Sequence, residues 1–242
     1  QTRYTHRLIS VLKLMPNLRV LDLTYNLHLT SNRVDIVNIL ANHCPLLEQL
    51  FLGCCWIPAE KLVNLQKLSF LKRLYLDHRK SKMEMCNLDL PSYDYVASFW
   101  NIATFVIPHL KELEYFSLTH VYWTDTQMDR TIQGLELFEF LKNAGPKFKG
   151  IFLTTAKSRD GSEPYDFVAG AVKMCKTLNR TSLMKIYLLN HMFINKDSAL
   201  IMDYFDSISP PFVQVKFSDY SFSEKLNSSD VRSKYVKLPK FL

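Results

Sequence analysis

The stretch Leu18-Arg19-Val20-Leu21-Asp22-Leu23, followed by Asn26, places its apolar residues in the order L-x-x-L-x-L-x-x-N. Its first part, L-x-x-L-x-L, returns at residues 47–52, with Cys55 in place of the asparagine, at 71–76, and at 113–118 with Phe116 as the fourth residue. Weaker copies in the same register pair Phe148 with Ile151 and Leu153, Leu183 with Ile186 and Leu188, and Phe212 with Val215 and Phe217. A phrase that recurs along a chain indicates internal repeats, so the sequence predicts seven successive strands.

Segments with apolar residues at three- and four-residue spacings lie between these strands, as in Val34, Val37, Ile39 and Leu40. The segments expected to be helical are 5–13, 34–40, 99–106, 130–143, 164–176 and 197–208. A strand, loop and helix cannot bury an apolar strand alone, so neighbouring units must stack. The expected result is a curved parallel sheet with helices outside it.

The recurring phrase is that of a leucine-rich repeat, so the predicted fold is an α/β leucine-rich-repeat solenoid of about seven irregular repeats. Equivalent positions are about 24 to 42 residues apart, which requires loop insertions. A doubly wound α/β sheet is the alternative, but no glycine-rich phosphate turn follows any strand. We assign residues 1–222 to the repeat domain and expect 223–242 to form a polar, basic, partly mobile tail.

Residues 18–55 resemble the cysteine-containing subclass of leucine-rich repeats, through Leu40-Ala41-Asn42-His43-Cys44-Pro45-Leu46-Leu47 and Leu50-Phe51-Leu52-Gly53-Cys54-Cys55. This subclass includes the F-box leucine-rich-repeat substrate receptors of cullin-RING ubiquitin ligases. The resemblance implies a concave sheet that captures a protein substrate and a separate helical module that contacts the ligase adaptor. Residues 1–17 hold no F-box-like segment, so that contact would depend on sequence outside this chain. Cys44, Cys55 and Cys175 look like repeat cysteines, expected to be inert packing residues.

The side chain between the last two leucines of each phrase should point away from the core, toward the concave face. Read across the repeats, this column is Asp22, Phe51, Tyr75, Ser117, Phe152, Tyr187 and Lys216. The column two residues earlier is Val20, Gln49, Arg73, Tyr115, Gly150, Lys185 and Gln214. Aromatic residues edged by cations have the composition of an interface. We therefore predict partner binding by Phe51, Arg73, Tyr75, Tyr115, Phe152, Lys185 and Tyr187. The alternatives are that strand propensity alone placed the aromatic residues there, or that an insertion covers them.

Most of the extra residues fall between a strand and the next helix, in 77–93, 119–130, 154–164 and 189–197, and should project from one edge of the sheet. These loops carry Arg79, Lys80, Lys82, Lys157 and Arg159. The five cations are a candidate basic rim that recognises acidic or phosphorylated segments. Ordinary solvated loop charge is the alternative.

No G-x-S-x-G, H-E-x-x-H, C-x-x-C or P-loop pattern occurs, so we expect no enzymatic activity and no cofactor. His78 and His120 follow neighbouring strands, with Asp77 close by, but two imidazoles at loop starts more often reflect chance than a metal site. The sequence therefore predicts no metal.

Lys and Arg exceed Asp and Glu by 30 to 23, a diffuse excess of +7. We expect a protein ligand on the concave face and loop edge; nucleic acid is a more weakly supported alternative, and a scaffold subunit without a ligase role is another.

The five cysteines lack disulfide spacing, and no apolar run reaches 18 residues. The expected location is the cytoplasm or nucleus, without membrane contact.

Overall fold

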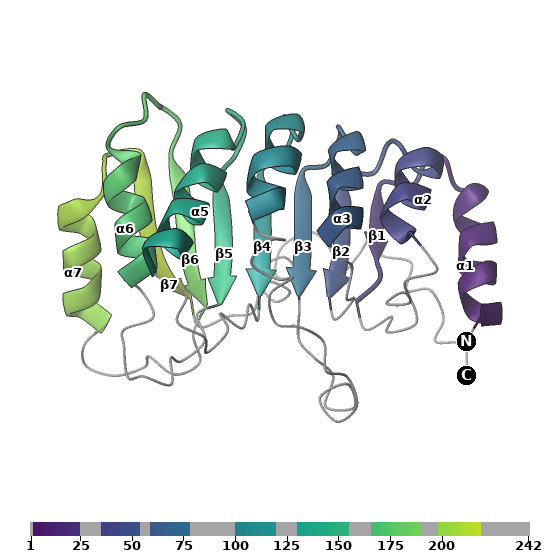
Figure 1. Ribbon diagram of the computed structural model, residues 1–242, viewed down its shortest axis with the longest axis horizontal. Coiled ribbons are helices and arrows are strands. Elements are labelled where there is room, and N and C mark those ends of the chain that lie inside the picture. Colours follow the sequence, from purple (N-terminus) through teal and green to yellow (C-terminus); the bar gives the residue numbers. More distant parts are fainter. Residues whose placement is uncertain are drawn as a thin grey trace.

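The chain folds around a single open sheet. The computed structural model describes residues 2–24, 35–53, 59–77, 100–119, 130–154, 166–189 and 198–218. Seven parallel strands lie side by side in chain order, and helices accompany them from one end of the sheet to the other (Figure 1). The predicted α/β fold with a seven-stranded parallel sheet is confirmed. The predicted tail, 223–242, lies outside the described residues.

Each strand begins two residues after the first apolar residue of its phrase, or one residue after it in the last two strands. The strands are β1 (Val20–Asp22), β2 (Gln49–Gly53), β3 (Arg73–Asp77), β4 (Tyr115–Thr119), β5 (Gly150–Thr154), β6 (Met184–Leu189) and β7 (Val213–Ser218). The phrases pair in register, with Leu50 beside Leu74 and Leu74 beside Phe116. The predicted columns therefore run straight across the sheet.

The helices match the periodic segments closely. They are α1 (Thr2–Lys13), α2 (Ile36–His43), α5 (Arg130–Asn143), α6 (Asp166–Cys175) and α7 (Ser198–Ile208). The segment at 99–106 contains a π-helical turn, η4 (Ile102–Val106), which continues into the 3-10 turn η5 (Ile107–His109). Between β2 and β3 the chain forms only α3 (Ala59–Leu62) and the 3-10 turn η2 (Val63–Lys67), which are too short to give a periodic signal. Within the described part of the chain, no helix is long and apolar enough to cross a membrane.

The central apolar residue of every phrase is buried against the helices. Leu50, Leu74, Phe116, Ile151 and Ile186 are inaccessible to solvent and belong to one core with the buried residues of the helices. The ring of Phe116 on β4 packs 4.8 Å from that of Phe140 on α5. One face of the sheet is thus sealed by the helical layer.

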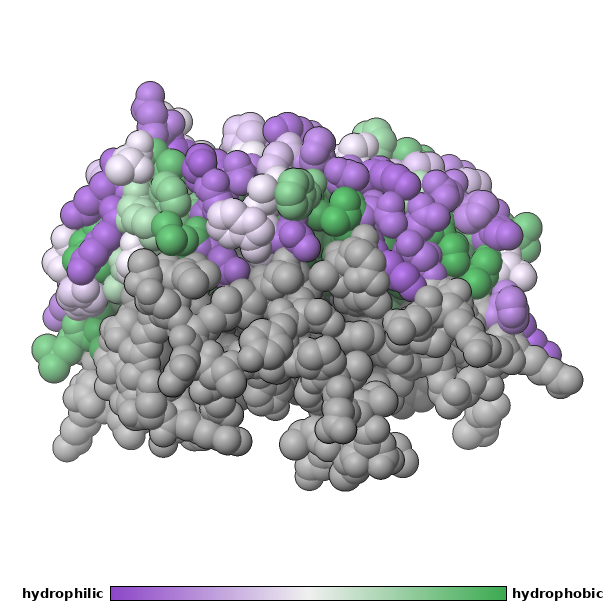
Figure 2. Space-filling view, in the orientation of Figure 1, coloured by the Kyte–Doolittle hydropathy of each residue, from purple (hydrophilic) through white to green (hydrophobic). Residues whose placement is uncertain are grey.

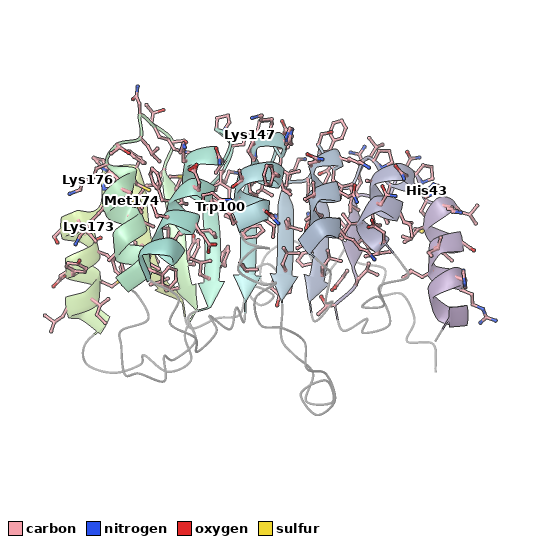
Figure 3. All side chains as sticks on the ribbon, viewed as in Figure 1. His43, Trp100, Lys147, Lys173, Met174 and Lys176 are labelled. Carbon is pink, nitrogen blue, oxygen red and sulfur yellow. The ribbon has the colours of Figure 1, made fainter. Side chains whose placement is uncertain are left out.

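The helical layer has a largely hydrophilic outer surface, in which apolar side chains form separate patches (Figure 2). Polar contacts also join neighbouring helices. Asp35 caps the start of α2 by accepting a hydrogen bond from the Asn38 backbone N–H (2.9 Å), and it also accepts one from the Asn64 amide of η2 (3.1 Å). Lys173 on α6, labelled in Figure 3, lies 5.6 Å from the centre of the Tyr204 ring on α7.

The turn before the sheet is itself repeated. The backbone N–H of the first apolar residue donates to the carbonyl three residues earlier, as in Leu47 to Cys44 (3.2 Å) and Leu71 to Leu68 (3.0 Å). Leu113 to Leu110 and Phe148 to Gly145 follow the same pattern, both at 3.1 Å. Because the same turn precedes β2, β3, β4 and β5, these strands enter the sheet in a common register.

Cys44 and Cys175 are fully buried free thiols in the core. Burial raises the pKa of both thiols, that of Cys175 to about 12. The Cys44 thiol donates to the Leu12 carbonyl oxygen at 3.6 Å. Both behave as the packing residues predicted for repeat cysteines, whereas Cys55 lies outside the described residues.

Glu136 is an acidic side chain enclosed within the helical layer. It lies on α5 and is 2% exposed, and in the described part of the chain its Oε2 atom has no hydrogen-bond partner. Burial raises the pKa of Glu136 to about 7, because the charged carboxylate loses its hydration. The folded protein therefore keeps this proton over a pH range in which the unfolded chain has already released it.

We predict that Glu136→Gln stabilises the protein at pH 8 but not at pH 5. Between the ordinary pKa of 4.5 and about 7 the unfolded chain binds fewer protons, so the free energy of unfolding falls as pH rises. Removing the ionisable group should recover roughly 1–3 kcal/mol at pH 8, measured by urea denaturation at both pH values. Glu139→Gln, which removes the partner of Lys142 on the same helix, is the control. Equal pH dependence in both variants would contradict the assignment.

Candidate functional site

The second face of the sheet carries the side chains predicted to bind a partner. Strand pairing aligns Phe51 with Tyr75, and Phe152 with Tyr187. In the neighbouring column, Arg73 lies beside Tyr115. Because side chains alternate along a strand, these residues point away from the helix-covered core.

Five aromatic residues on this face form a cluster separate from the main core. They are Phe51, Tyr75, Tyr115, Phe152 and Tyr187, which we call the aromatic face. The rings of Phe51 and Tyr75 are 6.2 Å apart, those of Tyr115 and Phe152 are 6.3 Å apart, and those of Phe152 and Tyr187 are stacked at 4.3 Å. Such contacts hold the rings in fixed positions, which lowers the entropy lost when a partner binds them.

The centre of the aromatic face is more enclosed than the sequence indicated. Phe152 is only 6% exposed, whereas Phe51, Tyr75, Tyr115 and Tyr187 are half-buried. Stacking by Tyr187 on one side and contact with Tyr115 on the other account for the low exposure of Phe152. Phe152 therefore supports its neighbours and differs from the exposed anchor that was expected.

A buried hydroxyl group interrupts the aromatic column. Ser117 pairs with Tyr75 on one side and Phe152 on the other, and it is inaccessible to solvent. Its Oγ atom has no hydrogen-bond partner among the described residues. A buried hydroxyl without a hydrogen bond costs stability. The Ser117 hydroxyl is therefore a hydrogen-bond donor at the centre of the aromatic face that no described residue uses.

Gly150 explains how Tyr187 reaches its stacked position. A Cβ atom at residue 150 would lie 3.1 Å from Cε2 of Tyr187 and 3.1 Å from the Lys185 carbonyl oxygen. The Tyr187 ring thus leans over β5 at the place where a side chain is missing. The sequence gives a glycine in this column but no sign that a neighbouring ring occupies its space.

Two cations flank Tyr115. The guanidinium carbon of Arg73 lies 5.9 Å from the ring centre, and the Lys149 ammonium lies 6.0 Å from it. Arg73 was predicted for this site, but Lys149 was not, because it precedes β5 and its position in the phrase assigns it to the other face. The long, flexible side chain of Lys149 nevertheless extends to the aromatic face.

Lys149 also belongs to a row of charges along the edge where the strands begin. Arg19 pairs with Glu48 (2.8 Å), Glu48 with Lys72 (2.7 Å), and Glu114 with Lys149 (2.8 Å). The charges alternate in sign from strand to strand. Hydrogen bonds from Lys72 and Arg19 lower the pKa of Glu48 despite partial desolvation, and the bond to Glu114 raises the pKa of Lys149.

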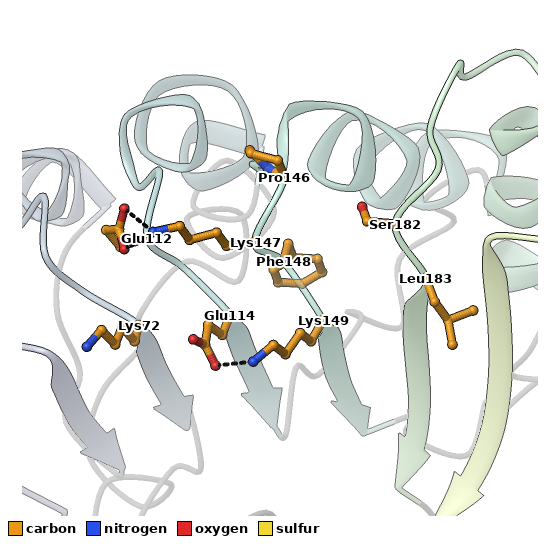
Figure 4. Close-up of a pocket in the computed structure, with 9 residues that line it drawn as sticks. All are labelled: Lys72, Glu112, Glu114, Pro146, Lys147, Phe148, Lys149, Ser182 and Leu183. Atoms are coloured by element: carbon orange, nitrogen blue, oxygen red, sulfur yellow. Dashed lines mark hydrogen bonds and ion pairs between the residues drawn. The ribbon is translucent and has the colours of Figure 1, made fainter.

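A hollow of about 560 Å³ lies at this edge (Figure 4). Its polar lining includes Lys147 paired with Glu112 (2.6 Å) and Lys149 paired with Glu114, both drawn as dashed lines. Because these charges already satisfy one another, the hollow offers a ligand little uncompensated charge.

Several predicted residues cannot be placed at this site. The basic rim residues Arg79, Lys80, Lys82, Lys157 and Arg159 lie outside the described residues, as do His78 and His120. Within the described ranges, no group of three or more His, Cys, Asp or Glu side chains could hold a metal ion. Of the predicted site residues, the structure therefore brings together those that lie on the strands.

Comparison of the chain with protein-family models, with curated proteins and with solved structures gives no match. The function is therefore inferred from the geometry of the chain itself.

We predict that Gly150→Ala destabilises the protein by about 1–3 kcal/mol, because the added methyl group must displace either the Tyr187 ring or a backbone carbonyl. The Gly170→Ala variant is the matched control. A Cβ there meets nothing within 4 Å, and alanine favours the interior of α6, so this variant should gain about 0.5–1 kcal/mol. Thermal melts measure both effects. If Gly150→Ala were neutral, Tyr187 would not depend on the missing side chain.

Proposed function

We propose that this chain is a protein-binding leucine-rich-repeat module whose aromatic face receives the partner. The observation that carries the proposal is the row of contacting aromatic side chains, edged by cations, on the face away from the helices. Aromatic and arginine side chains in fixed positions are typical of binding hot spots.

Support for the repeat architecture comes from features that recur in each unit. The apolar phrase, the turn before the strand and the strand register repeat together from β2 to β5. Stacked units of this kind bury one face of each strand against helices and leave the other for recognition.

Binding is favoured over catalysis by the chemistry of the face. Its rings and cations, such as Tyr115 with Arg73 and Lys149, are groups that orient a partner, and the Glu114 carboxylate beside them is already paired with Lys149. A surface made of rings and cations orients a partner, but it supplies no pair of acid and base.

Within this class, we propose a role as the substrate-recognising part of an F-box-type ubiquitin-ligase receptor, based on the resemblance of residues 18–55. A scaffold subunit without a ligase role uses the same surface. Purification of the full-length protein from native cells distinguishes the two: copurifying cullin-RING subunits support the receptor, and a stable assembly without them supports the scaffold.

We predict that Tyr75→Ala weakens partner binding by about 1–4 kcal/mol while leaving the fold intact. Tyr75 is half-buried outside the main core, so its loss leaves the helix-packed side of the sheet unchanged. A photo-crosslinking residue at position 75 identifies the partner, and affinity measurements with that purified partner compare the wild type with Tyr75→Ala.

Two controls accompany this test. A crosslinker at Lys142, on the helical side, should capture a different set of proteins. Leu74→Ala, which empties a fully buried site, should cost roughly 2–5 kcal/mol of stability. Undiminished binding by a normally folded Tyr75→Ala variant would exclude the aromatic face as the interface.

A further inference from the structure

Three cations on the second face of the sheet have no acidic partner within the part of the chain that the structure describes, unlike the cations at the strand-start edge. Among the described residues, Arg73, Lys185 and Lys216 form no ion pair, whereas Arg19, Lys72 and Lys149 at the strand-start edge do. The only acidic residue in the same two columns is Asp22, at the far end on β1. In the described ranges, this part of the surface therefore carries positive charge without an acidic partner.

Arg73 and Lys185 lie in one row across the sheet. The pairing runs from Arg73 through Tyr115 and Gly150 to Lys185. Three strand spacings of about 4.8 Å separate the two cations by roughly 14 Å at the backbone. The rings of Tyr115 and Tyr187 occupy the space between them, since Tyr187 leans over Gly150.

An extended peptide laid along this row has a matching repeat. Its residues rise about 3.3 Å each, so side chains at positions i and i+4 share one face and are roughly 13 Å apart. Position i+2 then lies midway, above the two tyrosine rings. Acidic residues at i and i+4 would match the positive charges of Arg73 and Lys185 and the distance between them, and an apolar residue at i+2 would contact the two rings.

We propose that the aromatic face binds an extended acidic segment of a partner protein, with Arg73 and Lys185 pairing two carboxylates four residues apart and Tyr115 and Tyr187 contacting the apolar residue between them. This inference rests on the proposed protein-binding function and specifies its ligand.

Lys149 adds charge at the Arg73 end of the row. Although it pairs with Glu114, its ammonium group lies over the same Tyr115 ring as Arg73. The two cations repel each other, and this repulsion lowers the pKa of Lys149 against the larger opposite effect of its bond to Glu114. A carboxylate bound beside Tyr115 relieves this repulsion.

A nucleic-acid strand fits the same surface less well. The rings of Phe152 and Tyr187 already stack on each other at 4.3 Å, so bases cannot insert between them. The adjoining edge also alternates in sign through Glu48 and Glu114, and gives a phosphate backbone no continuous positive track. These two features favour a peptide.

The test uses a fluorescently labelled peptide of sequence GESLSEG, with glutamates at the second and sixth positions and leucine between them. Its control has the same composition in the order GEESLSG. Anisotropy titrations of the full chain should show binding of the first peptide, and binding of the control several-fold weaker. Arg73→Gln and Lys185→Gln should each weaken the first peptide roughly threefold to tenfold, with Lys142→Gln on α5 as the charge-matched control.

Several outcomes overturn the inference. They are an absence of binding up to about 1 mM peptide, equal affinity for both peptides, or equal losses from Lys142→Gln and Arg73→Gln. Tighter binding of a ten-nucleotide thymidine strand, with steep salt dependence, would assign the cations to phosphates instead. If the GESLSEG peptide does not bind but Tyr75→Ala still reduces binding of the crosslinked partner, only the acidic-segment inference is wrong. If the peptide does not bind and Tyr75→Ala leaves partner binding unchanged, the proposed function is wrong as well.

Discussion

The packing of one apolar column against the helices controls the arrangement of everything else in this protein. Leu50, Leu74, Phe116 and Ile151 lie side by side at the centre of the sheet and are inaccessible to solvent. A one-residue slip of any strand would turn such a side chain to the other face. The register is therefore fixed by burial, and the opposite column is fixed with it, although its own residues are polar or aromatic.

The aromatic face follows from this constraint. Once Leu74 and Leu76 point inward, Tyr75 must point outward, beside Phe51. Backbone spacing within the sheet then brings the rings close enough to contact one another in a cluster separate from the main core. Within the described part of the chain the buried Ser117 hydroxyl has no hydrogen-bond partner, which costs stability at the centre of this surface.

The row of alternating charges has a different role. Arg19, Glu48 and Lys72 precede their strands and join neighbouring units through ion pairs at the exposed edge. Exposed pairs contribute little individually, but alternation also prevents like charges from facing each other in the common register. Because the charges at this edge pair with one another and those of the Arg73 to Lys185 row have no such partner among the described residues, the two charged regions of the sheet differ in what they offer a partner.

The sequence by itself determined the parallel sheet, its seven strands and the two outward columns, because the L-x-x-L-x-L phrase assigns each side chain to a face through the alternation of a strand. It also indicated most of the helices through their apolar spacing. Only the tertiary structure decided which outward residues are accessible and which charges are compensated. Phe152 is buried by rings from the two adjacent strands, Tyr187 occupies the space above Gly150, and Lys149 reaches Tyr115 by bending across the edge. These outcomes depend on the rotamers and lengths of side chains that are distant in sequence, and strand alternation gives the face of a residue but not the path of its side chain.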